Sequence, residues 1–181
     1  MNRLKNTRAY LGGAMDRVAD GGETWRRNIR SALNGLGIVW LDPTRKPIDI
    51  GVEDAASRKL RHKYKMEGNF QYVTDEMKPI RQVDLRMVDI SDWDIVNIDL
   101  EVHAAGTYEE LFLANQQRKP VVVHVEQGKK ACPDWIFATL PHQMIFSTWN
   151  EVVGYLHNIN SEKVIESFDR WRFFDFTGDG S

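Results

Sequence analysis

The chain has 181 residues, of which 42% are hydrophobic, and a formal net charge of −2 at pH 7. This length and composition allow a sizeable core without disulfides or metals, and the lack of a basic excess argues against a protein that coats nucleic acid. Cys132 is the only cysteine, and the sequence has neither a signal-peptide core nor a membrane-length apolar run, so we expect a cytoplasmic protein that does not engage a membrane.

The start of the chain predicts a strand, a helix and a second strand. Residues 8–13 are typical of a strand that ends in a glycine turn. Apolar residues between Trp25 and Leu36 recur at helical spacing, with Thr24 available as the N-cap. The short apolar run 38–41 predicts the second strand. Strand, helix and strand in this order are typical of a βαβ unit.

Residues 44–71 predict a different kind of segment. They mix charged residues with few large apolar groups, so we interpret them as a surface insertion or a flap over an active site, with a polar helix at 55–66. Further along, apolar residues from Ile80 to Ile90 repeat at steps of three and four. This stripe predicts a helix that begins near Pro79.

The second half of the chain predicts three more strands. A buried strand at 94–100 is followed by a helix at 107–118 and a strand at 121–125, and then by a strand at 143–146 and a helix at 150–158. A strand–helix–strand series of this kind forms a parallel sheet, and the loops at the carboxyl edge of such a sheet carry its chemistry. We therefore expect one α/β domain.

The aromatic residues of the C-terminal tail predict an additional packed segment. We assign residues 1–160 to the domain and 161–181 to the tail. Large rings in a terminal segment need a surface to cover, which is either this domain or a neighbouring subunit. The rings in question are Phe168, Trp171, Phe173, Phe174 and Phe176.

Glu110 is the first candidate for chemistry, and two interpretations of it stay open. Thr107-x-x-Glu110 matches the capping box that satisfies free amides at a helix start. Its position after a central strand instead favours a carboxylate in the helix's first turn, kept ionised by the helix and aimed at a bound ligand. Glu109, about 100° round the helix, is the competing carboxylate.

Asp84 and Tyr10 are candidates to assist a nucleophilic carboxylate. Asp84, which has Asp89, Asp92 and Asp94 nearby, belongs either to a solvated acidic face or to a pair of carboxylates that share glycosidic-bond chemistry. In such a pair, one carboxylate attacks the sugar carbon and the other handles the proton of the leaving group. Tyr10, at the end of the first strand, is either a core residue or a hydrogen-bond donor to the nucleophile.

Other motifs give weaker indications. Gly12 and Gly13 would let a ligand approach the backbone closely, but they do not form a GxGxxG fingerprint. No histidine has metal-binding spacing, and His103 is the one that we expect near a ligand. Covalent chemistry through serine or cysteine is disfavoured, because no G-x-S-x-G elbow occurs and Cys132 lacks a catalytic signature.

Several short motifs, taken in order, resemble the nucleoside 2-deoxyribosyltransferase-like proteins over roughly residues 8–149. The matching segments are Tyr10-Leu11-Gly12-Gly13-Ala14-Met15 with Trp25-Arg26, Asp84-Leu85 with Ser91-Asp92, Gly106-Thr107-x-x-Glu110-x-x-x-Ala114, and Arg118-Lys119-Pro120-Val121. Each motif is short, and their order and spacing together carry the resemblance.

The resemblance implies a flavodoxin-like (Rossmann-like) three-layer α/β sandwich with a five-stranded parallel sheet, assembled as a homodimer or a larger homo-oligomer. It also implies that no metal or organic cofactor is needed. In this family the residue matching Glu110 attacks the anomeric carbon and forms a covalent deoxyribosyl-enzyme. The residue matching Tyr10 orients it, and the residue matching Asp84 contacts or protonates the base. A second nucleobase then accepts the sugar.

Some positions depart from the family pattern. An aspartate that often precedes the glutamate is replaced by Ala104 and Ala105, so Asp99, Glu101 or His103 must serve in its place or the contact is lost. Asp89 is the alternative to Asp84. The complete set of expected substrate-binding residues is Gly12, Gly13, Asp89, Asn97, Asp99, His103, Gly106 and Thr107.

Three functions therefore remain open. The leading one transfers deoxyribose between nucleobases, and the second hydrolyses a nucleoside 5′-monophosphate at the same bond. The third is a non-catalytic nucleotide-binding module, which the missing aspartate favours. In each case the expected partners are a small nucleoside or nucleotide and, for the transferase, a free nucleobase, rather than nucleic acid or a membrane.

Overall fold

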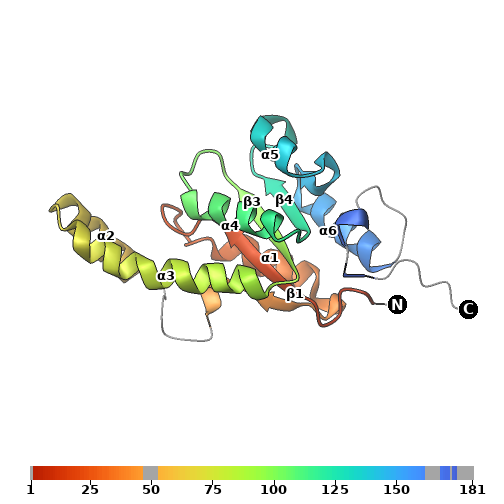
Figure 1. Cartoon of the computed structure of the whole chain (residues 1–181), viewed down its shortest axis with the longest axis horizontal. Helices are drawn as coiled ribbons and strands as arrows, with labels where there is room; N and C mark the ends of the chain where they lie inside the picture. Colours follow the sequence, from red (N-terminus) through yellow and green to blue (C-terminus); the bar gives the residue numbers. More distant parts are fainter. Residues whose placement is uncertain (1, 47–52, 162–167, 172, 175–181) are drawn as a thin grey trace, which may run out of the picture.

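A parallel sheet forms the centre of the molecule (Figure 1), as seen in a computed structural model that describes residues 2–46, 53–161, 168–171 and 173–174. Within these residues the sheet has five strands in the order β2-β1-β3-β4-β5, and every neighbouring pair is parallel. The strands are β1 (Arg8–Gly13), β2 (Val39–Leu41), β3 (Trp93–Ile98), β4 (Val121–Val125) and β5 (Ile145–Phe146). The predicted flavodoxin-like α/β fold is confirmed.

Helices cover both faces of this sheet. The α-helices are α1 (Glu23–Ala32), α2 (Ala55–Met66), α3 (Phe70–Ile90), α4 (Ala105–Gln116), α5 (Asp134–Thr139) and α6 (Trp149–Asn160). Short 3₁₀ turns lie at Asn34–Leu36, Pro43–Arg45, Lys129–Ala131, His142–Met144 and Phe168–Arg170. None of the helices in the described ranges combines the length and apolar character needed to cross a membrane.

Side chains along each strand point alternately to the two faces of the sheet, and this divides the core into two halves. Ala9 and Leu11 of β1 pack with α1 and α6 on one face, whereas Tyr10 between them packs with α3 and α4 on the other. Side chains that follow one another in a strand point to opposite faces, so a single strand contributes to both halves. This alternation places Tyr10 on the face covered by α4.

A column of stacked side chains joins α1, α6 and β4. The Trp25 ring lies 5.2 Å from that of Trp149, and the Trp149 ring lies 4.1 Å from that of His124. The Arg26 guanidinium lies over the Trp25 ring, 4.6 Å from its centre. Stacked rings and cation–π contacts of this kind add to the stability gained from burying the rings.

The helix near Pro79 differs from the prediction. Helix α3 begins at Phe70, nine residues before Pro79, and the Asn69 side chain caps it by accepting from the Tyr72 amide. Pro79 therefore lies inside the helix, where it removes one backbone hydrogen bond. The helix predicted at 55–66 is confirmed as α2. With the first half of α3 it forms a hairpin that projects from the sheet (Figure 1).

Helix α1 also begins differently from the prediction. Gly22 occupies the N-cap position, and Thr24, the predicted cap, lies in the first turn. The Asp20 carboxylate accepts from the amides of Gly22 and Thr24, so it performs the expected capping role from outside the helix. A carboxylate at a helix start accepts hydrogen bonds from the free amides and also interacts favourably with the helix dipole.

Trp171 fixes part of the C-terminal tail on the sheet. It is fully buried, its indole Nε1 donates to the Tyr155 hydroxyl at 2.9 Å, and its ring lies 5.3 Å from that of Trp93. Phe174 stacks on it, whereas Phe173 is 46% exposed. Phe176 and the side chain of Phe168 lie outside the described residues.

Replacing Trp171 should therefore destabilise the fold. We expect Trp171→Ala to lower the free energy of unfolding by about 3–5 kcal/mol, because it removes a large buried ring and leaves a cavity. Urea denaturation followed by circular dichroism measures the change. Phe173→Ala is the matched control and should cost less than about 1 kcal/mol. Equal losses for the two variants would contradict the role of Trp171.

Candidate functional site

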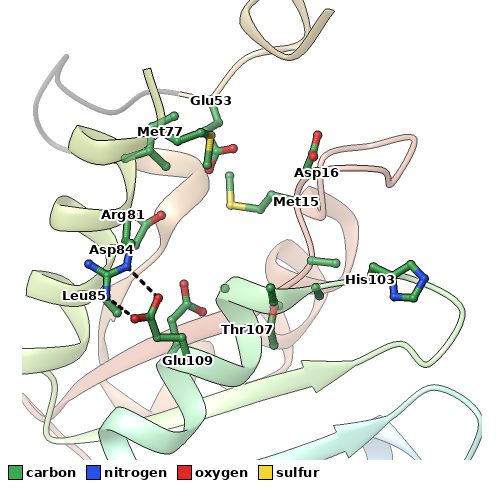
Figure 2. A pocket seen from close by; sticks show the side chains of 17 residues that line it. Met15, Asp16, Glu53, Met77, Arg81, Asp84, Leu85, His103, Thr107 and Glu109 are labelled. Atoms are coloured by element: carbon green, nitrogen blue, oxygen red, sulfur yellow. Dashed lines mark hydrogen bonds and ion pairs between the residues drawn. The ribbon is translucent and has the colours of Figure 1, made fainter. Parts of the chain in front are cut away.

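A cavity of about 380 Å³ opens at the carboxyl edge of the sheet, between the loop after β1, helix α3 and the start of α4 (Figure 2). Open parallel sheets bind ligands at this edge. The residues that line the cavity are Gly13, Ala14, Met15, Asp16, Glu53, Met77, Ile80, Arg81, Asp84, Leu85, His103, Ala104, Ala105, Gly106, Thr107, Glu109 and Glu110.

Arg26 holds the loop that forms one wall of the cavity. Its guanidinium is fully buried and donates to the carbonyl oxygens of Leu11, Gly13 and Gly22 at 3.1, 2.8 and 2.8 Å. These three bonds tie the end of β1 to the start of α1, and Asp42 lies 3.8 Å away as a counter-charge. A buried charge is tolerated when it is paired and hydrogen-bonded in this way.

The start of α4 does not form the predicted capping box. The helix begins at Ala105, its N-cap position is Ala104, and no side chain caps it. Thr107 is therefore the third helical residue, and Glu110 is the sixth, in the second turn rather than the first. Glu110 lies too far into the helix to satisfy the free amides at its start. The structural interpretation of this motif is wrong.

Glu110 instead faces the cavity from beneath. A side-chain carbon on Gly12 would lie 3.2 Å from Glu110 Oε2, so the glycine leaves room for the carboxylate against β1. Burial and then the negative charge of Asp84 raise the pKa of Glu110 to about 8. A partly buried carboxylate pays this desolvation penalty, and the expectation that the helix keeps Glu110 ionised is therefore wrong near neutral pH. Such a group is typical of functional sites.

Tyr10 lies against Glu110 from β1. Its side chain is fully buried, and burial followed by the charges of Glu110 and Asp84 raises its pKa well above the usual value. The Tyr10 hydroxyl acts to lower the pKa of Glu110, although it makes no hydrogen bond of regular geometry with any described residue. It is a buried donor that faces a carboxylate, as expected for a residue that orients it.

Glu109 has a different environment from Glu110. Both of its carboxylate oxygens contact the Arg81 guanidinium, with Arg81 Nε donating at 2.9 Å, and this pairing lowers the pKa of Glu109 (Figure 2). The pair is exposed, at 58% for the Arg81 side chain and 41% for that of Glu109. An exposed, paired carboxylate is a poor nucleophile. Of the two adjacent glutamates, Glu110 is therefore the better candidate.

Asp84 approaches the same cavity from α3. It is 8% exposed, and Lys46 Nζ lies 2.8 Å from its Oδ1. Burial raises the pKa of Asp84 to about 6, although Lys46 acts to lower it. Asp84 and Glu110 each raise the energy of charging the other, so the two carboxyls titrate as a pair. Between about pH 6 and 8 this pair holds one proton, which these pKa values place on Glu110.

The other predicted residues fall into two groups. Gly13, His103, Gly106 and Thr107 line the cavity, and Gly12 supports Glu110 from below.

The structure does not bring Asp89, Asn97 or Asp99 to this cavity. Asp89 accepts from Gln117 Nε2. Asn97 donates to Glu126 and contacts His124, and Asp99 accepts from Gln127. Both Asn97 and Asp99 line a second cavity of about 290 Å³ on the other side of the β1 loop.

Several lining residues were missed from the sequence. Met77, Ile80 and Arg81 recur with Asp84 at steps of three and four, a pattern that would have placed them together had α3 been extended back past Pro79. Glu53 gave no such signal, because it reaches the cavity from the segment that we interpreted as an insertion.

Two other kinds of chemistry have little support in the described part of the chain. It contains no group of three or more histidine, cysteine, aspartate or glutamate residues arranged to hold a metal ion. Cys132 is buried, and burial raises the pKa of its thiol to about 11. A thiol with such a pKa is a weak nucleophile near neutral pH.

The pKa of Glu110 makes stability depend on pH. Its contribution to stability is fully present below about pH 4.5 and is lost as the pH rises towards 8, because the folded state must then bury a charge. We therefore expect Glu110→Gln to be more stable than the wild type at pH 9, by about 1–3 kcal/mol, and to show a smaller difference at pH 6.

Urea denaturation at the two pH values measures this difference. Glu109→Gln is the matched control, since Arg81 lowers the pKa of Glu109, and this variant should not gain stability at pH 9. An unchanged pH dependence in Glu110→Gln would show that Glu110 is not the buried titrating group.

Comparisons with known proteins agree with this architecture. No protein-family model matches the sequence, and neither does any curated protein. A 2-deoxyribosyltransferase from the psychrotolerant bacterium Bacillus psychrosaccharolyticus is 18% identical, with 82% of this chain and 92% of that chain covered and a TM-score of 0.54.

Two other solved structures have lower TM-scores. A 2-desoxiribosyltransferase from Leishmania mexicana is 19% identical, with 67% of this chain and 66% of that chain covered and a TM-score of 0.45. A conserved protein from Enterococcus faecalis V583 is 17% identical, with 86% and 88% covered and a TM-score of 0.44. The chain thus has a nucleoside 2-deoxyribosyltransferase-like fold, established by the likeness to the Bacillus structure.

Proposed function

We propose that the protein is a nucleoside 2-deoxyribosyltransferase-like enzyme, which cleaves the N-glycosidic bond of a 2′-deoxynucleoside and transfers the sugar to another nucleobase. The observation that carries this proposal is the partly buried Glu110 carboxylate, which faces a ligand-sized cavity together with Asp84. The fold shared with a 2-deoxyribosyltransferase described as a biocatalyst for nucleoside synthesis supports it.

Glu110 is the nucleophile in this proposal. Near neutral pH the proton of the pair rests on Glu110, so it must first pass to Asp84. The ionised Glu110 oxygen then attacks the anomeric carbon, the bond from that carbon to the base nitrogen breaks, and the bonding electrons leave with the base. Asp84 supplies the proton that neutralises the departing base. The result is a deoxyribose esterified to Glu110 and a free nucleobase. A second base then attacks the same carbon, its N–H proton passes to the Asp84 carboxylate, and Glu110 is displaced as a carboxylate, so that two inversions give net retention.

The charge around the cavity favours a neutral nucleoside as the substrate. Five carboxylates line the cavity, and the Arg81 guanidinium among them is already bound to Glu109. A phosphate dianion would be repelled by these groups. The carboxylates are Asp16, Glu53, Asp84, Glu109 and Glu110.

A monophosphate N-glycosidase remains the second candidate because of the start of α4. The first turn of this helix lines the cavity, lacks a side-chain cap and has no side chain at Gly106. Free amides at a helix start favour an anion.

Incubation with deoxyinosine and cytosine, analysed for deoxycytidine, tests the transferase. Release of deoxyribose 5-phosphate from a deoxynucleoside monophosphate tests the hydrolase. If neither product forms but a nucleotide still raises the melting temperature, a binding module is left.

Glu110→Gln should abolish transfer. We expect its turnover to fall by roughly 10³-fold or more, because the amide has the same shape but is a poor nucleophile. Intact-mass analysis should detect one added deoxyribosyl unit on the wild-type chain and none on this variant. Glu109→Gln is the matched control and should keep the adduct. An adduct that persists in Glu110→Gln would reassign the nucleophile.

The rate should depend on pH in a bell-shaped manner. We expect kcat/KM to peak near pH 7, to fall below about pH 6 because both carboxyls are protonated, and to fall above about pH 8 because the proton for the leaving base is lost. In Asp84→Asn the fall above pH 8 should disappear, and the rise should shift to higher pH, because it then follows the ionisation of Glu110 alone, whose pKa is raised mainly by burial. If the high-pH fall survives in Asp84→Asn, another group is the proton donor.

A further inference from the structure

Glu53 brings a third carboxylate to the inner part of the cavity from outside the sheet. Its Oε2 accepts from Arg61 Nη2 at 3.2 Å, and each of these side chains is only 7% exposed. Arg61 comes from the second turn of α2 and also contacts the Ser57 hydroxyl. The orientation of the Glu53 carboxylate is therefore fixed by α2 and not by the sheet.

Glu53 and Asp84 are held in the same way. Lys46 binds one oxygen of Asp84, and Arg61 binds one oxygen of Glu53. The second oxygen of each carboxylate makes no hydrogen bond with a described residue, and both residues line the cavity. The negative charge of Glu53 also raises the pKa of Asp84, so the two carboxylates act on one another. Figure 2 shows both entering from the α2–α3 side, with Met15 across from them.

Two carboxylate oxygens that have no hydrogen-bond partner among the described residues and belong to residues lining one cavity would suit a group that donates two hydrogen bonds. A carboxylate accepts and never donates when ionised, so a carbonyl oxygen placed here would be repelled. An exocyclic amino group has two N–H donors and no charge. The neighbouring apolar side chains of Met15, Met77 and Ile80 would contact the faces of the ring that carries it.

We propose that Glu53 is a specificity-determining residue, which binds the exocyclic amino group of the acceptor nucleobase together with Asp84, once Asp84 has given its proton to the departing base. The site would thereby select amino-bearing bases, such as adenine and cytosine, over bases with a carbonyl at that position, such as hypoxanthine and thymine. This inference rests on the proposed function, because the ligand is taken to be a nucleobase.

The variant Glu53→Gln gives the sharpest test. Arg61 donates hydrogen bonds, so it should retain the oxygen of the introduced amide and turn the amide NH₂ towards the cavity. The amide NH₂ would then face the amino group of adenine, which is also a donor. The carbonyl of hypoxanthine would instead gain a hydrogen-bond donor. We expect the preference for adenine over hypoxanthine, measured as the ratio of kcat/KM for the two acceptors, to fall by roughly 10- to 100-fold.

Glu67→Gln is the matched control. Glu67 follows the last turn of α2, its side chain is 52% exposed, and it faces Lys63 on the same helix. This variant should keep the wild-type ratio. If Glu53→Gln does not fold, Glu53→Asp replaces it, since it keeps the charge but withdraws the carboxylate by one methylene, and the ratio should again fall. An unchanged ratio in the folded variant would overturn the role of Glu53.

Binding of free bases separates this inference from the proposed function. Calorimetric titration of the wild type with adenine and with hypoxanthine should show tighter binding of adenine, and Glu53→Gln should remove the difference. If no sugar is transferred but this preference holds, the transferase proposal fails and the role of Glu53 stands. If transfer occurs while adenine and hypoxanthine bind equally to the wild type and to the variant, the role of Glu53 is wrong and the transferase stands.

Discussion

The structure of the site depends on one unfavourable interaction, the desolvation of the partly buried Glu110 carboxylate beside the buried carboxylate of Asp84 at the same small cavity. Glu110 has no ion pair among the described residues, so its charge is opposed by desolvation and by Asp84. The surroundings reduce this penalty in particular ways. Arg26 adds a positive charge behind β1, the Tyr10 hydroxyl faces the carboxylate, and Gly12 leaves space beside it. A site of this kind exchanges stability for reactivity.

Apart from Arg81, which lines the cavity and is paired with Glu109, the cations that stabilise the site lie behind the carboxylates. Lys46 binds Asp84 with a side chain that is 1% exposed, Arg61 binds Glu53, and Arg26 is enclosed by backbone carbonyls. Acceptor oxygens are therefore presented to the ligand while the positive charges remain out of its reach. This distribution suits a neutral ligand that is rich in N–H donors, and it is unfavourable for an anion.

The sequence predicted the sheet better than the site. The residues of β1, β4 and α2 were predicted to the residue, because strands buried on both faces and a charged helix have distinct patterns. Glu110 was found from its place after a central strand, while the capping box suggested by Thr107 proved wrong. Asp89, Asn97 and Asp99 lie outside the main cavity because several side chains share one sheet edge, and spacing does not tell on which side of a loop each will lie. Lys46 and Glu53 depend on contacts with α2 and α3 that no local pattern encodes.

The α2–α3 hairpin separates two tasks within one small protein. Glu110 is anchored on a helix packed against the sheet, whereas Glu53 and Arg61 belong to a segment that projects away from it (Figure 1). Changes in the hairpin can alter which bases enter without disturbing the core that supports bond cleavage. The choice of acceptor base would thus change between related chains more readily than the reaction itself. Directed evolution of variants that make new nucleoside analogues would begin with this hairpin.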